Sequence, residues 1–288
     1  MKQYTSLYFV GAGGIGMSAL VRYFLAKGYK VAGYDRTQSP LTTELKTEGL
    51  EIVYEESVES IPDYCRNPET TLVVYTPAIP ASHAGLVYFR EHSFRVVKRA
   101  ELLGLITQSS KGLCFAGTHG KTTTSSMAAH IFHESPIGCN AFLGGILRNY
   151  NSNLILSEQS PFTVIEADEY DRSFHWLHPY MAVVTATDPD HLDIYGTEEA
   201  YLESFARFTS LIQPGGCLIM KKGIKLVPSV KENVKIYTYS ARDGGDFHAG
   251  NIRIGDGTIV FDFVMPEGSV ADIELGVPVE INIENAVA

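Results

Sequence analysis

The chain has 288 residues, of which 45% are hydrophobic and 19% are charged, and its formal net charge is −10. This length predicts two domains, and the acidic charge argues against nucleic acid as a partner. The 4 cysteines form no CxxC pair and no apolar run is long enough to span a membrane, which is typical of a cytoplasmic protein with reduced thiols.

The first part of the chain alternates strand and helix patterns. Apolar runs typical of buried strands lie at 5–10, 29–34, 51–54, 72–76 and 96–97. Helix patterns lie at 15–27 and 84–92. This alternation predicts a parallel, doubly wound sheet.

A glycine-rich turn follows the first predicted strand. Gly11-Ala12-Gly13-Gly14-Ile15-Gly16 fits G-x-G-x-x-G, a turn whose backbone amides and helix N-terminus approach a pyrophosphate. Asp35 ends the second predicted strand, where an acidic residue can hold a ribose. The motif does not choose among NAD, FAD and a UDP-sugar, because all three carry a pyrophosphate, and a purely structural turn is the alternative.

A second strand and glycine loop begin at residues 112–116, after a polar segment that predicts a domain boundary between 109 and 110. The loop is Gly117-Thr118-His119-Gly120-Lys121-Thr122-Thr123. Its amides can cradle phosphates, Lys121 can reach the β- and γ-phosphates, and the Thr122 hydroxyl can bind Mg²⁺. Phe115 stands where the usual P-loop has its first glycine, so the match is incomplete.

Two clusters with acidic residues follow later strands. Glu166-Ala167-Asp168-Glu169-Tyr170-Asp171 ends the predicted strand at 162–167, and Asp188-Pro189-Asp190-His191 follows the one at 181–186. Carboxyl ends of parallel strands line one crevice, so Glu166, His191 and the P-loop are expected to converge there on Mg²⁺. A histidine beside Mg²⁺ is unusual and suggests a second, substrate-side ion. Solvated turn residues and a structural histidine are the alternative.

The remaining sequence predicts a helix at 198–212 and a strand at 217–220. After Pro228, the runs KIYTY, FHAGNIRI, TIVFDFV and ADIELGV predict antiparallel strands packed on the side of the second sheet. INIENAVA reads as the first turns of a helix without a partner, which suggests a further domain. The predicted fold class is α/β: a Rossmann-like domain at 1–109 and a central P-loop ATPase-type domain at 110–288 with an antiparallel side sheet.

The motifs suit phosphoryl transfer to a substrate carboxylate, which needs positioning and charge neutralisation more than covalent help. The sequence contains no HExxH motif and no spaced cysteine cluster. It also contains no recognisable Ser-His-Asp or Cys-His nucleophile set.

Four runs of the sequence resemble the Mur ligase family, and the likeness extends over essentially all 288 residues. They are GAGGIGMSAL, AIPASHAGLVYFREHSFRVVKRAELLG, GTHGKTTTSSM and EADEYDRSFHWLHPYMAVVTATDPDHLDIYG. The family form of the P-loop is GTxGKT[TS], which accounts for Phe115. The resemblance implies a three-domain, ATP- and Mg²⁺-dependent, ADP-forming ligase whose C-terminal domain is absent here. It also implies the reaction, in which L-alanine joins the lactyl carboxylate of UDP-N-acetylmuramate through an acyl phosphate.

The resemblance also implies site residues. Those for the UDP-sugar are Gly13, Gly14, Ile15, Gly16, Asp35, Thr76, Ala78 and Ile79. Those for ATP are Gly117, Thr118, His119, Gly120, Lys121, Thr122, Thr123, Asn282 and Asn285. The catalytic residues are Lys121, His119, Glu166 and His191, and the metal ligands are Thr122, Glu166 and His191. Ala186 and Ile281 stand where the family often has Asn and His, which affects details of ATP contact.

Three other functions remain open. A related ligase adds a tripeptide to the same UDP-sugar, but SFHWLHP and DPDHLDIYG favour the alanine-adding type. An NAD-dependent dehydrogenase would leave the P-loop and both acidic clusters without a role. The third alternative is a non-catalytic nucleotide-binding module. This fragment fits that alternative in a narrow sense, because without a closing domain we expect it to bind nucleotide weakly and not to turn over.

Overall fold

The computed structural model describes residues 3–242, 244–255 and 257–288, which form two compact units. The first unit runs to Ile106 and also takes in Ala141–Leu156. The second unit consists of Thr107–Asn140 and Ser157–Ala288. The domain limits 1–109 and 110–288 stay a prediction, and the units are described separately below.

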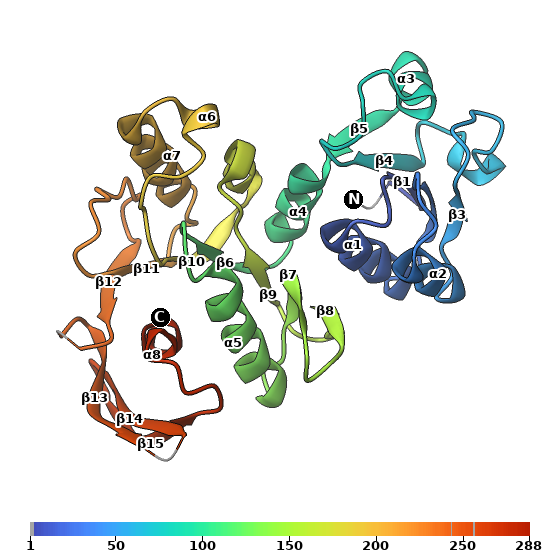
Figure 1. Cartoon of the computed structure of the whole chain (residues 1–288). Helices are drawn as coiled ribbons and strands as arrows, with labels where there is room; N and C mark the ends of the chain where they lie inside the picture. The colour runs from blue at the N-terminus through green and yellow to red at the C-terminus, as the bar shows by residue number, and fades with distance from the viewer. Residues whose placement is uncertain (1–2, 243, 256) are drawn as a thin grey trace. The chain divides into compact units, whose positions relative to one another are not determined.

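The first unit contains a parallel sheet with strand order β3-β2-β1-β4-β5 (Figure 1). Its strands are β1 (Ser6–Val10), β2 (Lys30–Tyr34), β3 (Glu51–Val53), β4 (Thr71–Tyr75) and β5 (Arg95–Lys98). The helices along this stretch are α1 (Ile15–Ala26), α2 (Pro40–Thr47), η1 (Asp63–Cys65), α3 (Ala84–Glu91) and α4 (Arg99–Gln108). The parallel sheet predicted from the alternating pattern is therefore confirmed. Every residue of β1 is buried, as expected for a central parallel strand covered on both faces.

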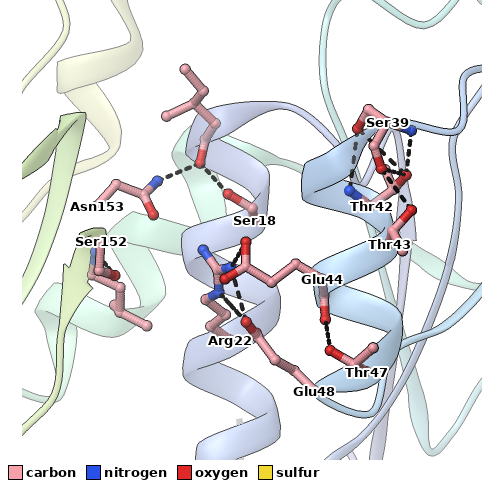
Figure 2. Close-up of polar contacts among 12 residues, drawn as sticks. Ser18, Arg22, Ser39, Thr42, Thr43, Glu44, Thr47, Glu48, Ser152 and Asn153 are labelled. Carbon is pink, nitrogen blue, oxygen red and sulfur yellow. Dashed lines mark hydrogen bonds and ion pairs between the residues drawn. The ribbon is translucent and has the colours of Figure 1, made fainter. Parts of the chain in front are cut away.

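Polar contacts fix the start of α2 and its neighbourhood (Figure 2). Ser39 caps the helix: its side chain accepts from the Thr42 amide, and the Thr42 hydroxyl accepts from the Ser39 amide at 2.8 Å. Arg22 of α1 donates to both carboxylate oxygens of Glu48, at 3.0 and 2.8 Å from Nε. The two helices after the glycine turn are thus held in place by local side-chain chemistry.

A β-hairpin that the sequence patterns did not predict packs on α1. It consists of β7 (Asn140–Leu147) and β8 (Ser152–Ile155), which pair antiparallel. Asn153 Nδ2 donates to the Ile15 carbonyl at 2.6 Å, close to the glycine turn (Figure 2). The rings of Tyr23 and Phe142 lie 5.1 Å apart. The hairpin therefore supports the helix that begins at the first glycine loop.

The second unit is built on a mixed sheet with strand order β15-β14-β13-β12-β11-β10-β6-β9 (Figure 1). Its strands are β6 (Lys111–Ala116), β9 (Phe162–Glu166), β10 (Pro179–Val184), β11 (Cys217–Lys221), β12 (Lys235–Ser240), β13 (Phe247–Gly255), β14 (Thr258–Met265) and β15 (Gly268–Leu275). Its helices are α5 (Lys121–Glu134), η2 (Tyr170–Trp176), α6 (Leu192–Tyr195), α7 (Glu198–Ser210) and α8 (Ile281–Val287). The predicted start of a helix at the end of the sequence is confirmed as α8.

The strands after Pro228 differ in one respect from the expectation. β13, β14 and β15 form the predicted antiparallel arrangement, but β12 pairs in parallel with both β11 and β13. These strands continue the edge of the main sheet rather than lying on its side. The alternating pattern of KIYTY predicts a half-exposed strand correctly but carries no information about its direction. Among the described residues, no helix is both long and apolar enough to cross a membrane.

Candidate functional site

In the first unit, the glycine loop joins β1 to α1 at the carboxyl edge of the sheet. Gly11 has φ +90°, and a Cβ there would lie 2.7 Å from Thr76 Cγ2 and 3.4 Å from Ile79. The loop after β4 therefore lies against the first glycine, while the predicted role of Thr76 and Ile79 in enclosing the UDP-sugar stays a prediction. Ala78, between them, is exposed.

Asp35 contacts the glycine loop directly. Its Oδ2 accepts from the Gly13 amide at 2.7 Å, and its Oδ1 accepts from the Thr37 amide at 3.1 Å. The Gly13 amide is thus already bonded to a carboxylate, so an anion has to use the amides further along the turn. Gly14 is the N-cap of α1, and the amides of Ile15 and Gly16 open the first helical turn, where N–H groups have no intrahelical acceptor. Asp35 therefore anchors the loop, and its predicted contact with uridine stays a prediction.

Sequence reasoning missed a basic residue at this loop. A Cβ on Gly16 would lie 2.8 Å from Arg99 Nη1, so the guanidinium lies against the third glycine. Arg99 begins α4 directly after β5, another parallel strand of the same sheet. The signal was available, because the carboxyl ends of parallel strands meet at one edge and Arg99 comes directly after Lys98, the last residue of that strand.

In the second unit, the loop of residues 117–120 joins β6 to α5. Gly117 has φ +139° and Gly120 has φ +85°, conformations that favour glycine. A Cβ on Gly117 would overlap the Thr185 hydroxyl, and one on Gly120 would lie 2.8 Å from Asn285 Oδ1. The loop is therefore pressed between the end of β10 and α8, and only glycine fits at either point.

Two hydroxyl groups hold this loop to the neighbouring strand end. The Thr185 hydroxyl bonds to the His119 carbonyl and also lies 3.2 Å from the Ala116 carbonyl. The Thr118 hydroxyl donates to the Asp188 carbonyl at 2.7 Å and lies 2.9 Å from the Tyr201 hydroxyl. The backbone that would cradle phosphate is thus fixed before any ligand arrives.

We expect Thr185→Val to destabilise the fold by about 1 kcal/mol, because the nearly isosteric side chain no longer donates to the His119 carbonyl, while the Ala116 carbonyl still accepts from the Thr185 amide at 2.9 Å. Urea unfolding of this variant and of Thr185→Ser, which keeps the hydroxyl, measures the effect. A valine variant as stable as the wild-type protein would mean that the hydroxyl does not hold the loop.

The structure brings together three of the predicted residues at the start of α5. Lys121 Nζ donates to the Gly117 carbonyl at 2.6 Å and to Glu169 Oε1 at 2.9 Å. The Thr122 hydroxyl donates to Glu166 Oε1 at 3.0 Å. Glu166 ends β9, beside β6, so the predicted convergence of the P-loop and the first acidic cluster is observed.

His191 lies in the segment between β10 and α6, and the structure gives it contacts other than those predicted. It adopts φ +52° as the N-cap of α6, its amide donates to Asp190 Oδ1 at 2.7 Å, and its ring meets the Tyr170 ring edge-on at 5.2 Å. Within the described residues, no three His, Cys, Asp or Glu side chains gather closely enough to hold a metal. The hydroxyl and carboxylate of Thr122 and Glu166 are the oxygen donors that Mg²⁺ prefers, and they fit one ion. The second ion beside His191 stays a prediction.

Of the two asparagines of α8, Asn285 reaches the P-loop helix and Asn282 contacts Asn285. Asn285 Nδ2 donates to Asn282 Oδ1 at 3.2 Å, and the Thr124 hydroxyl lies 3.4 Å from Asn285 Oδ1. Thr123 is half-buried and the His119 side chain is exposed. Ala186 is buried while Ile281 is 59% exposed, so the two departures from the family pattern lie in different environments.

The sequence patterns did not single out Glu169 or Tyr195 at this site. Glu169 is 1% exposed, and both of its carboxylate oxygens lie 2.9 Å from Lys121 Nζ. Burial raises the pKa of Glu169, and the Lys121 ammonium partly offsets this by lowering the pKa. The Tyr195 hydroxyl donates to the Glu169 carbonyl. One acid of the EADE cluster is therefore a buried partner of the lysine.

The chain is similar to known ligases along its whole length. A UDP-N-acetylmuramate–L-alanine ligase from Parabacteroides distasonis is 66% identical over 288 residues, which are 100% of this chain and 62% of that protein. The ligase of the same name from Phocaeicola vulgatus is 66% identical over 98% of this chain and 62% of its own length. The chain thus spans about three-fifths of the length of these relatives.

A solved structure has the same fold. The UDP-N-acetylmuramate–alanine ligase from Thermotoga maritima superposes with a TM-score of 0.80 at 24% identity, over 98% of this chain and 63% of that one. Residues 6–111 match the catalytic domain of the Mur ligase family, and residues 115–288 match the Mur ligase middle domain. The chain therefore belongs to the Mur ligase family.

Proposed function

We propose that this chain is the UDP-sugar- and ATP-binding part of a cytoplasmic, ADP-forming ligase that joins L-alanine to the lactyl carboxylate of UDP-N-acetylmuramate. The observation that carries the proposal is the hydrogen bond between Thr122 and Glu166 beside Lys121, at the end of a glycine loop. A hydroxyl, a carboxylate and an ammonium at one strand edge suit a magnesium-bound triphosphate. The names and 66% identity of the relatives support the choice of substrates.

In the second unit, the amides of residues 117–120 and the Lys121 ammonium bind the phosphates of ATP. Thr122 and Glu166 hold Mg²⁺, which neutralises charge on the phosphates when bound. Asn282 and Asn285 face the nucleotide from α8. The exposed His119 side chain lies at the loop, where it can approach the muramyl carboxylate.

The chain contributes to the reaction mainly by positioning the reacting groups. A lactyl carboxylate oxygen forms a bond to the γ-phosphorus while the β–γ oxygen–phosphorus bond breaks, which yields an acyl phosphate and ADP. The L-alanine amine then attacks the acyl carbon and loses a proton, and phosphate leaves from the tetrahedral intermediate. Lys121 stabilises the negative charge on the transferring group during the first step.

In the first unit, we assign the diphosphate of the UDP-sugar to the amides of Gly14, Ile15 and Gly16 and to the Arg99 guanidinium. Arg99 supplies a local positive charge in a chain whose net charge is −10. Thr76, Ala78 and Ile79 enclose the ligand from the loop after β4. Asp35 holds the glycine turn through Gly13.

The test is an assay on a polypeptide that extends this sequence over the full length of its relatives. We expect phosphate release that requires ATP, Mg²⁺, UDP-N-acetylmuramate and L-alanine together. Release with a tripeptide in place of L-alanine, and none with L-alanine, would favour the related tripeptide-adding ligase. Tight binding of NADH, with no affinity for UDP-N-acetylmuramate, would instead favour the dehydrogenase.

A further inference from the structure

The strongest unassigned feature is the ion pair between Lys121 and Glu169. Glu169 is 1% exposed, whereas the Lys121 side chain is 15% exposed, so the carboxylate lies on the protein side of the ammonium. Its Oε2 has no hydrogen-bond partner among the described residues, although it lies 2.9 Å from Nζ. A buried carboxylate with a single cationic partner is costly unless that partner stays in place.

A buried tyrosine holds the backbone of Glu169 in place. The Tyr195 hydroxyl donates to the Glu169 carbonyl, and the Ser204 hydroxyl lies 3.4 Å from the same tyrosine oxygen. Tyr195 itself is 5% exposed, and the Arg172 guanidinium covers its ring at 4.6 Å. The backbone that carries the Glu169 side chain is therefore anchored independently of Lys121.

The ammonium of lysine has three donors and no acceptor. At Lys121, one donor is used by the Gly117 carbonyl at 2.6 Å and one by Glu169 at 2.9 Å. This leaves one N–H for a phosphate oxygen. Two fixed acceptors thus define where the lysine head lies before phosphate binds.

We propose that Glu169 is a positioning residue that holds the Lys121 ammonium for phosphoryl transfer and contributes little to nucleotide binding. The inference rests on the proposed function, because it assigns a role within that ATP site. It predicts a particular kinetic pattern. A carboxylate beside the phosphates repels them and so opposes ATP binding. The same carboxylate restricts the flexible lysine side chain before the reaction, so less side-chain entropy is lost when the transition state forms.

The first experiment is Glu169→Gln in the polypeptide extended over the length of its relatives. We expect kcat to fall about tenfold or more, while KM for ATP stays within about twofold or decreases. The matched control is Glu198→Gln, which removes the carboxylate from the surface pair with Lys225 at 2.7 Å. Lys225 is 75% exposed, so the control should leave both constants unchanged.

Two further measurements separate positioning from a purely structural role. In a Lys121→Met background, Glu169→Gln should change the residual single-turnover rate by less than about twofold, because Glu169 acts through Lys121. In this chain alone, the NMR order parameter of the Lys121 ε-methylene should fall in Glu169→Gln and also in Tyr195→Phe, which keeps the carboxylate and removes its anchor.

Three outcomes would overturn the inference: an unchanged kcat, an equal loss of kcat on the Lys121→Met background, or a loss of ATP affinity as large as the loss of kcat. If the extended wild-type protein releases no phosphate, the proposed function fails instead. The order parameter of Lys121 then still decides whether Glu169 positions it, because that measurement needs no turnover.

Discussion

Replacing Lys121 with alanine is expected to lower ATP-dependent turnover at least about 10³-fold in the extended polypeptide, with UDP-sugar affinity nearly unchanged. The substitution removes the cation that the structure places at the start of α5, beside Glu169 and Gly117. The proposed UDP-sugar residues belong to the other compact unit, so their chemistry is untouched. Phosphate release and calorimetric titration of UDP-N-acetylmuramate measure the two effects.

Loss of the Lys121 side chain also affects Glu169, its buried partner. Alanine at position 121 leaves Glu169 without its counter-charge, so the free energy of unfolding should be measured alongside activity. Lys225→Ala removes a lysine from the surface pair with Glu198 and should affect neither measurement. Normal phosphate release by Lys121→Ala would show that the ATP site has been assigned to the wrong loop.

The second large effect is expected for Gly14→Asp, which should weaken binding of the UDP-sugar at least about 100-fold. The side chain fits, because Gly14 has φ −69° and ψ 145° and its nearest neighbours lie 4.0 Å from the position of a Cβ. Gly14 is also the N-cap of α1, where aspartate is a favourable residue. The fold should therefore be as stable as before, while a carboxylate opposes the diphosphate.

Gly14→Asn is the matched control, since it adds a side chain of the same size and the same capping ability without the charge. Titration of UDP and of UDP-N-acetylmuramate into both variants separates repulsion from steric obstruction. Equal losses in the two variants would assign the effect to size alone. Wild-type affinity in Gly14→Asp would mean that the diphosphate does not bind at this loop.

Much of the architecture follows from local patterns. Apolar runs separated by helix patterns predict both parallel arrangements, because each strand that is buried on both faces needs a helical crossover. Direction is harder. β12 has an alternating pattern like that of β13, yet it pairs in parallel with both β11 and β13, and the pattern within a strand does not show which strands it pairs with or in which direction.

Some residues of the candidate site could be placed from the sequence and others could not. The glycine loops and strand ends place Lys121, Thr122 and Glu166 at one edge, so motif spacing was sufficient for these residues. Spacing could not show which acid of the EADE cluster is buried, because this depends on Tyr195, located 26 residues further along the chain. It also could not show that Asp35 bonds to Gly13, since hydrogen bonding to a loop amide leaves no trace in composition.

The hairpin of β7 and β8 has a consequence for dissecting the molecule. The first unit needs residues 141–156, which lie beyond the P-loop helix in the sequence, so no single cleavage separates two complete folding units. A fragment ending at residue 109 would lose the Asn153 contact to Ile15 and the ring of Phe142 beside Tyr23. The first unit is thus discontinuous in sequence, and the last part of it to leave the ribosome is the hairpin that packs on α1, the helix after the first glycine loop.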